Sequence, residues 1–357
     1  IYRGKMHATE SGEPGNPIHF TADPTWGDGP ARIYGSVRIT DGWKRCTAKD
    51  APGIPDPQKV WYKDLGTDFD TDSKDTKLSA IWRTDGPEVK RIHIARAPNW
   101  TITDPNNPVS NWYNWEAFIG AANRGWLIDA RNWLGKPKDF FEGCTIWTQH
   151  RNLMGSVHRI GLEEYDPARG AFKISSPGGA LYRRGGRPDE PYKLGDRVHY
   201  YIEDVRGLLD APGEYYYDVD GPFPGRLYIR MDDDSSPNDA TLEAAQIRSP
   251  IEIFDRNHIE VSNLHFSFND DDDGLYGYPW YISASPMVRA VGNCTDIHVH
   301  HCTFYNVMNA VVAFPRPSGV GGPARASEPD IGKFQDDVMD NIVITDKDVR
   351  NNDMMGA

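Results

Sequence analysis

The acidic residues that could do chemistry are concentrated in one run, Asp270, Asp271, Asp272 and Asp273. Hydrolysis of a glycosidic bond requires two carboxyl groups, roughly 5–5.5 Å apart in retaining enzymes and roughly 6.5–9.5 Å apart in inverting ones. Asp353 matches Asp270 in the repeat described below, so Asp270 and Asp353 are candidate catalytic groups. Alternatively, Asp270–Asp273 form a solvated loop or a calcium site, with Asp271, Asp272 and Asp273 as the candidate ligands, and Asp353 caps a turn.

A second group of titratable residues is rich in histidine. His298 and His300 alternate along one predicted strand, and His301 lies at its end. Glu260 takes the place of His298 in the preceding copy of the repeat, so we expect the two side chains to be neighbours and to form an acid/base or sugar-binding pair. We expect His300 and His301 to contact a sugar. The alternative is that these are ordinary polar side chains on the solvent-exposed face of a strand, without a role in function.

Four aromatic residues follow the acidic run, at Tyr276, Tyr278, Trp280 and Tyr281. Their flat rings could stack on the faces of pyranose units, which makes them candidate substrate-binding residues. The alternative is a loop that packs back on the rest of the protein.

A polysaccharide lyase would need a base, and a cation that neutralises the carboxylate of a uronate. Lys347, Arg350 and Arg289 are candidates for the cationic role, and calcium could join them at the acidic run. The net charge of the chain, −13, disfavours binding of a polyanion without such a cation. A lyase therefore ranks below a hydrolase.

A short pattern that occurs three times must position these residues. In each copy apolar and polar residues alternate, a corner follows, and a second short alternating segment ends the copy. Alternation with period two indicates strands with one buried face, and such units must stack to bury it. The copies run over 257–266, 295–304 and 340–349. The aligned apolar positions are Ile259, Ile297 and Ile342; Val261, Val299 and Ile344; and Phe266, Phe304 and Val349.

The repeat predicts an all-β fold, a right-handed parallel β-helix (solenoid). The alternative is three unrelated strands in a sandwich. Lys347 departs from the pattern, because it takes the corner position at which Leu264 and Cys302 are apolar. Its amino group must therefore reach solvent or a partner.

Three segments are expected along the chain. Residues 1–40 are predicted to be the first coils, because Ile18 and Phe20 alternate with polar residues after a Gly/Pro turn. Residues 41–248 are predicted to be a β-rich insertion, with strands broken by Pro, Gly and Asp turns. Residues 249–357 are expected to resume the coils and to be truncated at the C-terminal end, because no capping element follows them.

The composition excludes two classes of partner. The chain is acidic and has no run rich in Lys and Arg, so a phosphate backbone would be repelled and nucleic acid is not expected. No apolar stretch reaches the ~18 residues that a membrane helix requires, so no membrane span is expected. The four cysteines allow three full pairings, and the sequence does not choose among them: Cys46, Cys144, Cys294 and Cys302.

Several motifs carry a resemblance that covers nearly the whole chain. They are Ser11-Gly-Glu-Pro-Gly-Asn-Pro-Ile18, Ile39-Thr-Asp-Gly-Trp43, Ala95-Arg-Ala-Pro-Asn99, Tyr200-Tyr-Ile-Glu-Asp204 and Leu209-Asp-Ala-Pro-Gly-Glu-Tyr-Tyr-Tyr-Asp218. With them the chain resembles the N-terminal half of secreted right-handed parallel β-helix proteins of the pectate-lyase-like superfamily. Most similar are the β-helix glycoside hydrolases that act on plant-type and fucose-containing glycans. In that family the coils continue past the point at which this sequence stops, so we expect a segment of a longer chain.

The resemblance implies an extracellular or cell-surface carbohydrate-active protein. We expect a glycoside hydrolase that acts on a polysaccharide through paired carboxylates, with no required cofactor and with calcium as an optional ligand. One alternative is a non-catalytic surface, adhesive or filament-forming protein that self-associates. The other is a calcium-assisted polysaccharide lyase. A cleft that joins carboxyl groups to the aromatic loop favours an enzyme, whereas acidic residues scattered into solvent favour a structural protein.

Overall fold

A computed structural model shows a mostly β protein, in which α1 (Ala130–Trp133) is the α-helix of the described part. Short 3₁₀ turns are η1 (Pro57–Lys59), η2 (Arg206–Leu208) and η3 (Pro237–Asp239). Among the residues described, no helix is long and apolar enough to cross a membrane. The structure describes residues 1–66, 69, 77–107, 109–121, 124–149, 157–175, 192–193, 198–270, 286–291, 294–307, 312–313, 338–340 and 343–344.

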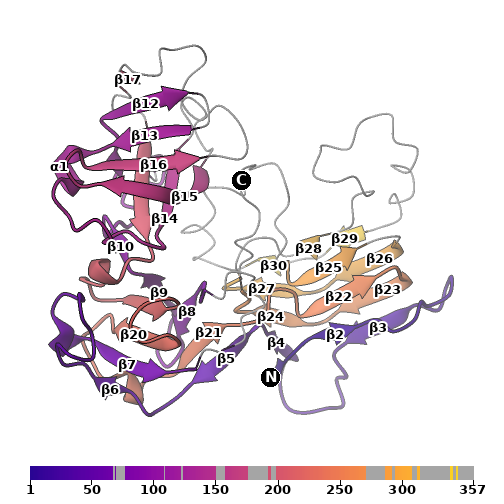
Figure 1. Ribbon diagram of the computed structural model, residues 1–357. Helices are drawn as coiled ribbons and strands as arrows, with labels where there is room; N and C mark the ends of the chain where they lie inside the picture. The colour runs from indigo at the N-terminus through magenta and orange to yellow at the C-terminus, as the bar shows by residue number, and fades with distance from the viewer. Residues whose placement is uncertain are drawn as a thin grey trace.

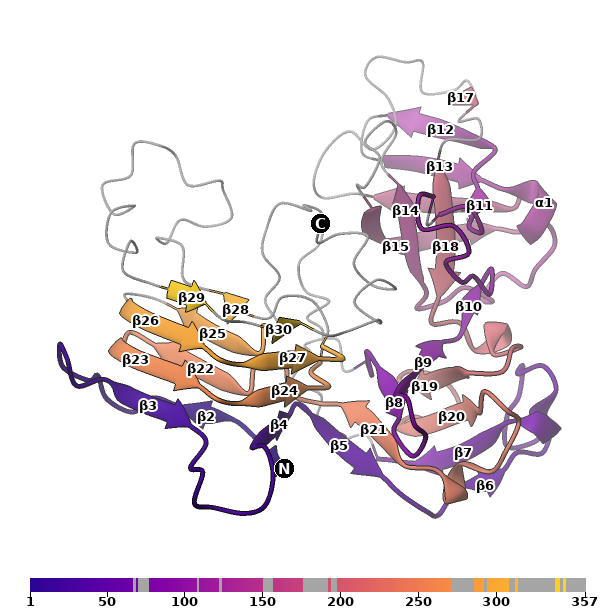
Figure 2. The same cartoon turned by 180° about the vertical axis from the view of Figure 1, so that it is seen from behind.

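The first and last parts of the described chain form three stacks of parallel strands (Figure 1, Figure 2). The chain adds one strand to each stack in turn, and each strand pairs in parallel with the strand one round earlier. The first stack contains β2 (Met6–His7), β22 (Ile251–Phe254), β25 (Val288–Val291) and β28 (Val312–Ala313). The second contains β3 (Ile18–Thr21), β23 (Asn257–Ser262), β26 (Thr295–His300) and β29 (Val338–Asp340). The third contains β1 (Tyr2–Arg3), β4 (Arg32–Tyr34), β24 (His265–Ser267), β27 (Thr303–Tyr305) and β30 (Val343–Ile344).

The inward positions of these strands are apolar, as the alternation predicts. Ile259 pairs with Ile297 across β23 and β26, and Phe266 pairs with Phe304 across β24 and β27. All four side chains are buried. The first two copies of the repeat therefore stack in the register expected from the sequence.

The corners of the rounds also recur. Left-handed backbone conformations occur at positions 38 residues apart, at 258 and 296, at 263 and 301, and at 268 and 306. Between the rounds, Asn257 Oδ1 accepts hydrogen bonds from the backbone N–H and the hydroxyl of Thr295, both at 2.9 Å. The sequence repeat is thus a repeat of backbone conformation as well as of apolar residues.

The third copy of the repeat is displaced by one strand, so its predicted alignment is wrong. The sequence aligned Ile344 with Val299, but Ile344 pairs with Phe304, and Val299 pairs with Met339. Alternating apolar residues occur in both the second and the third strand of a round, so their spacing alone does not distinguish the two strands. Lys347, the exception in that alignment, lies outside the described residues.

Residues 36–245 form two further sheets, which are antiparallel except where β9 pairs with β19. The sheet that adjoins the parallel stacks (Figure 1) contains β5 (Ser36–Ile39), β21 (Leu242–Ala245), β8 (Ile81–Arg83), β9 (Lys90–Ile94), β19 (Glu214–Asp218), β20 (Arg226–Arg230), β7 (Trp61–Asp64) and β6 (Lys44–Arg45). The outer sheet contains β10 (Arg96–Ala97), β18 (His199–Glu203), β14 (Thr145–Gln149), β15 (Val157–Asp166), β16 (Ala171–Ser175), β13 (Arg124–Ile128), β12 (Ala117–Ala121) and β17 (Tyr192–Lys193), and β11 (Tyr113–Asn114) pairs with β18.

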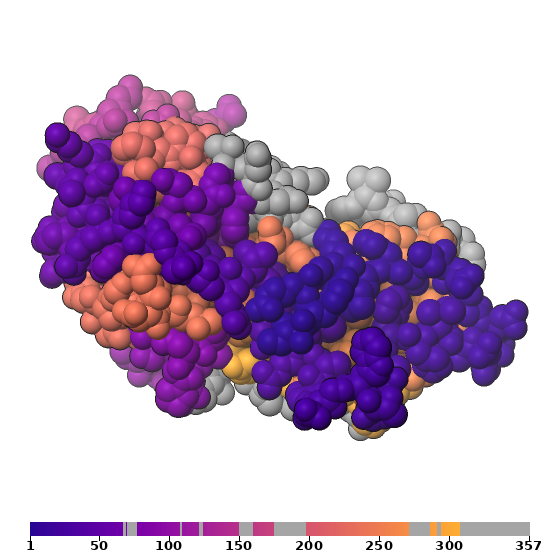
Figure 3. Space-filling view, turned by 90° about the horizontal axis from the view of Figure 1, so that it is seen from below, coloured from indigo at the N-terminus to yellow at the C-terminus, as the bar shows by residue number. Residues whose placement is uncertain are grey.

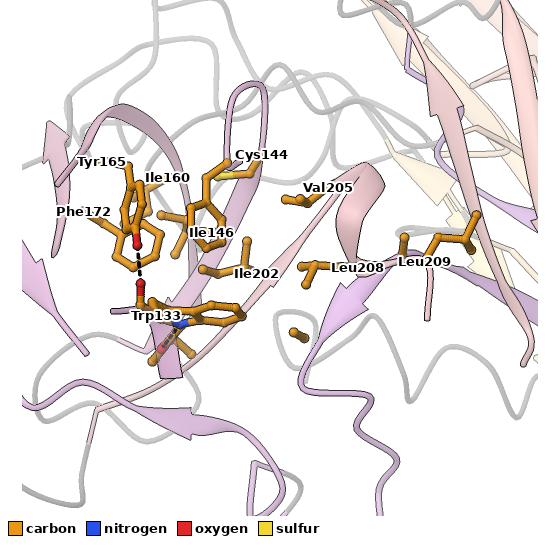
Figure 4. Packing of buried hydrophobic residues seen from close by; sticks show 14 of the residues in the cluster. Trp133, Cys144, Ile146, Ile160, Tyr165, Phe172, Ile202, Val205, Leu208 and Leu209 are labelled. Atoms are coloured by element: carbon orange, nitrogen blue, oxygen red, sulfur yellow. Dashed lines mark hydrogen bonds between the residues drawn. The ribbon is translucent and has the colours of Figure 1, made fainter. Parts of the chain in front are cut away.

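An aromatic core holds the outer sheet together (Figure 4). Trp133 donates its indole N–H to the Tyr200 hydroxyl at 2.6 Å, and Tyr200 donates to Asp129 at 2.6 Å. Tyr165 donates to the backbone carbonyl of Trp133. The polar atoms of these buried rings are therefore satisfied. Cys144 lies in the same core, and all four cysteines are buried and free, so none of the pairings that the sequence allows is formed.

Gly35 joins the parallel and antiparallel parts. Its N–H donates to the carbonyl of Ser267 at 3.0 Å, and its carbonyl accepts from the N–H of Ile247 at 2.8 Å. A Cβ atom on Gly35 would lie 2.6 Å from the Ile247 carbonyl oxygen and 2.7 Å from Asn269 Cα, so this close approach requires glycine. From below, the N-terminal residues spread over the parallel strands, beside the antiparallel part (Figure 3).

Candidate functional site

The structure places Asp270 inside the protein, at the junction of its two parts. The Asp270 side chain is fully buried and accepts a hydrogen bond from the Ser79 hydroxyl. Its backbone N–H donates to the Ile247 carbonyl at 2.9 Å. Asp270 therefore links β24 to the antiparallel sheet that contains β8. The other acidic and aromatic candidates lie outside the described residues: Asp271, Asp272, Asp273, Tyr276, Tyr278, Trp280, Tyr281 and Asp353.

Glu260 is the centre of a polar row on the outer face of the second stack. As expected, Glu260 and His298 are register partners on adjacent strands, and His19 is the partner of Glu260 on β3. The carboxylate of Glu260 nevertheless contacts His300 and His19. Glu260 Oε1 lies 3.1 Å from His300 Nε2 and 3.2 Å from His19 Nδ1. The ring centroids of His298 and His300 are 4.3 Å apart, so the histidines form one cluster around this acid.

The row continues as a hydrogen-bonded chain to His301. His300 Nδ1 lies 2.6 Å from His301 Nδ1. When His300 Nε2 donates to Glu260, the neutral ring has an acceptor at Nδ1, so His301 Nδ1–H is the donor. A proton can thus pass between His301 and Glu260 through one imidazole, which is acid/base chemistry. No group of three or more His, Cys, Asp or Glu side chains in the described part is arranged to hold a metal ion.

The environment favours the ionised form of Glu260. Burial acts to raise the pKa of this carboxyl, but the hydrogen bond from His300 and the charges of His19 and His300 together outweigh it. The pKa of Glu260 therefore lies below its ordinary value. A carboxylate that stays ionised beside imidazole donors suits a base or a nucleophile better than an acid.

Glu260→Gln tests this environment through stability. A carboxyl whose folded-state pKa is lowered stabilises the fold above its unfolded-state pKa, and this contribution is lost as the pH falls through the folded-state pKa. The wild type is expected to be more stable than Glu260→Gln at neutral pH, and the difference should shrink on acidification. Urea unfolding of both proteins between about pH 3 and 7 measures it. If the difference in unfolding free energy between the two proteins is constant over this range, the histidines do not lower the pKa of Glu260.

A cleft of about 430 Å³ lies between the third parallel stack and the adjoining antiparallel sheet. Its floor is the outer face of β4, β24 and β27, and its walls come from β5, β21 and the turn at 84–89. Alternation in the three floor strands brings their first and third residues to this face. One row of the floor is Arg32, His265 and Thr303, and the next is Tyr34, Ser267 and Tyr305.

A buried acid forms part of the cleft wall. Glu243 is fully buried and accepts hydrogen bonds from Arg3 Nη2 at 2.5 Å, from the Ser36 hydroxyl at 2.8 Å and from Arg38 Nε at 3.4 Å. The Arg3 guanidinium also lies over the ring of Tyr34, 5.1 Å from its centroid. These contacts fix the carboxylate and tie β21 to β1 and β5.

The sequence reasoning missed this cleft, although a signal was present. The segments 32–34, 265–267 and 303–305 share a pattern in which a buried Ile or Phe lies between two side chains of the outer face. Aligning the first of these segments with the other two would have placed Arg32 beside His265. No local pattern indicates Glu243, which reaches the cleft from a strand of another sheet.

Comparisons with known proteins give one structural similarity. No family model matches this sequence, and no curated protein matches it. A solved structure described as "Glycoside hydrolase" is similar at 13% sequence identity, with a TM-score of 0.49. The similarity covers 78% of this chain and 50% of that chain, so this chain spans about half the length of that protein.

Proposed function

We propose that this chain is a carbohydrate-active protein built on a right-handed parallel β-helix, with a β-rich insertion that begins at β5 (Ser36–Ile39), a few residues before the expected position 41, and ends before the coils resume at 249–357. The order of pairing supports the β-helix, because successive strands join three stacks in turn and pair with the round before. The change from parallel pairing at β4 to antiparallel pairing at β5, and back at β22, supports the insertion.

The cleft is the observation that carries the function. A saccharide presents hydroxyl groups at its edge and C–H groups on its ring faces, so its sites combine a few placed polar groups with aromatic surface. The cleft offers the guanidinium of Arg32, the imidazole of His265 and the hydroxyls of Ser267 and Thr303, next to the ring of Tyr305. A glycan is the partner that this combination fits, and we propose that the protein meets it outside the cell.

Hydrolysis of the glycosidic bond is the activity that we propose for this site. Phe268 lines the cleft, and the acidic run at 270–273 follows almost directly in the sequence. Asp270 is fully buried, so two carboxyl groups from Asp271, Asp272 and Asp273, or one of them with a later acid such as Asp353, would provide the acid and the base of a glycosidase. Calcium is the ligand that we propose for the run if its oxygens act as donors. Glu260 with His300 is the second candidate for acid/base chemistry.

Calorimetric titration with a panel of oligosaccharides tests the binding part of this proposal. Tyr305→Ala is expected to weaken binding about 3- to 10-fold, because it removes one aromatic contact of the floor. Trp26→Ala is the matched control, since Trp26 is an aromatic residue of the coils that is 84% exposed and does not line the cleft. Equal losses in the two variants would argue against the cleft as the binding site.

The products of a polysaccharide digest decide the activity. New reducing ends without unsaturation would support a hydrolase, whereas unsaturated uronate ends would identify a lyase. Binding without cleavage would leave a glycan-binding protein and overturn the proposed hydrolysis. Absence of any binding, together with self-association in sedimentation, would overturn the whole proposal in favour of the structural protein.

A further inference from the structure

We propose that the saccharide bound in the cleft is anionic, and that Arg32 and His265 recognise its carboxylate or sulfate ester group; this inference rests on the function proposed above. It concerns the charge of the ligand, which neither the fold nor the overall composition indicates. The chain as a whole carries a net charge of −13, which would repel such a ligand unless the cleft differs from the rest of the surface.

Arg32 and His265 are available for a ligand. They are register partners on β4 and β24, and both line the cleft. Within the described part of the chain, neither side chain has a hydrogen bond or an ion pair. By contrast, Arg83, Arg226 and Arg230 each hold a carboxylate at 2.6–2.7 Å. An arginine that pairs with no carboxylate of the described residues, on the floor of a cleft in an acidic protein, suits an anion.

The acid in the cleft wall does not cancel this charge. Glu243 is the one carboxylate among the described residues that line the cleft, and it is already bound by Arg3 and Arg38. In the turn at 84–89, Asp85 is bound by Arg83 at 3.1 Å and does not line the cleft. Among the described residues that line the cleft there are thus two guanidinium groups, of Arg32 and Arg38, and one carboxylate, that of Glu243.

The arrangement of the floor fits an anionic sugar better than a free inorganic ion. A guanidinium presents a planar fork of N–H groups that matches a carboxylate or a sulfate, and an imidazole beside it can add a further hydrogen bond. Thr303 continues the same row on the next strand, roughly 4.8 Å further on, and Ser267 lies in the adjacent row. Hydroxyl groups of the sugar ring can meet these two side chains while its acidic group meets Arg32.

Pairs of ligands that differ only in charge show whether the charge or the shape of the saccharide determines binding. The 357-residue chain would be titrated with a uronate tetrasaccharide, with the neutral methyl ester of the same tetrasaccharide, with a sulfated tetrasaccharide, and with its desulfated form. At least one charged ligand is expected to bind about 10-fold or more tightly than its neutral counterpart, and the advantage should decrease as salt rises. The tighter of the two charged ligands identifies the carboxylate or the sulfate as the natural group.

Arg32→Gln tests the residue that carries the proposal. It is expected to weaken binding of the charged ligand about 10-fold or more and to leave the neutral one nearly unchanged. Arg32→Lys keeps the charge but not the fork, so an intermediate loss is expected. Arg124→Gln is the matched control, because Arg124 is exposed on β13 and does not line the cleft. Because Arg32 is exposed, both glutamine variants should unfold at the wild-type temperature.

The outcomes separate the two proposals. If neutral and charged ligands bind equally well, or if Arg32→Gln and Arg124→Gln behave alike, the anionic specificity is refuted while saccharide binding stands. If no saccharide of either class binds, the proposed function fails and this inference fails with it. If inorganic sulfate competes as strongly as the sulfated tetrasaccharide, the site is an anion site and the sugar plays no part.

Discussion

Phe266→Ala is expected to lower the free energy of unfolding by about 3–5 kcal/mol. Phe266 is fully buried, and its ring stacks on Phe304 with centroids 4.9 Å apart and planes within 8°. On its other side it pairs with Ile33, so this one residue joins three successive rounds of the third stack. Alanine leaves a cavity that the stack cannot close, because hydrogen bonds fix the strand spacing.

Phe254→Ala is the control for this prediction. Phe254 ends β22 in the same round, but it is 41% exposed, so its loss should cost less than about 1 kcal/mol. Urea unfolding followed by far-ultraviolet circular dichroism measures both variants. If Phe266→Ala costs no more than Phe254→Ala, the stacked core does not exist as described. Because Phe266 lies between two floor residues of the cleft, its loss should also weaken saccharide binding.

The parallel part was predictable from sequence to the extent that its pattern is local. Alternation and a recurring turn placed Ile259 against Ile297 and Phe266 against Phe304, and the structure confirms both pairs. The same reasoning failed for Ile344, because the second and third strands of a round offer the same alternation. Register between rounds depends on the length of the connection, and an apolar pattern does not encode that length.

The candidate site was less predictable, because its residues come from distant parts of the chain. Sequence placed Glu260 beside His298 correctly, but the contacts of its carboxylate with His300 and His19 depend on where long side chains turn. The cleft combines a strand near residue 32 with strands near 243, 265 and 303. Net charge is an average over the whole chain, so it does not show that Arg32 is exposed on the floor of the cleft.

Glu214→Gln is expected to stabilise the protein, by an amount that grows with pH. Glu214 is 3% exposed on β19, and burial is the main cause that raises its pKa from 4.5 to about 8. Its carboxyl accepts hydrogen bonds from the backbone N–H groups of Ala211 at 3.1 Å and Arg96 at 3.4 Å. The Arg96 guanidinium lies over the ring of Trp100 and donates to the Trp100 carbonyl, so it offsets the burial of Glu214 only in part.

The direction of this effect follows from proton linkage. Between pH 4.5 and about 8 the folded state holds a proton on Glu214 that the unfolded state releases, so stability falls as the pH rises through this interval. At roughly 1.4 kcal/mol per pKa unit, the free energy of unfolding falls by at most about 5 kcal/mol above pH 8 because of this group. Glutamine keeps the neutral shape and removes the titration.

Thermal unfolding of the wild type and Glu214→Gln at several pH values checks this prediction. The two proteins should be similarly stable near pH 5, and the variant should unfold at a higher temperature near pH 9. Glu10→Gln, which removes an exposed carboxyl, should not reproduce this divergence. If the unfolding temperatures of wild type and Glu214→Gln change with pH in the same way, Glu214 is ionised in the folded state. Arg96 or water then compensates its burial. The antiparallel part would then contain a buried ion pair where we place a neutral acid, and its stability would depend on keeping both partners.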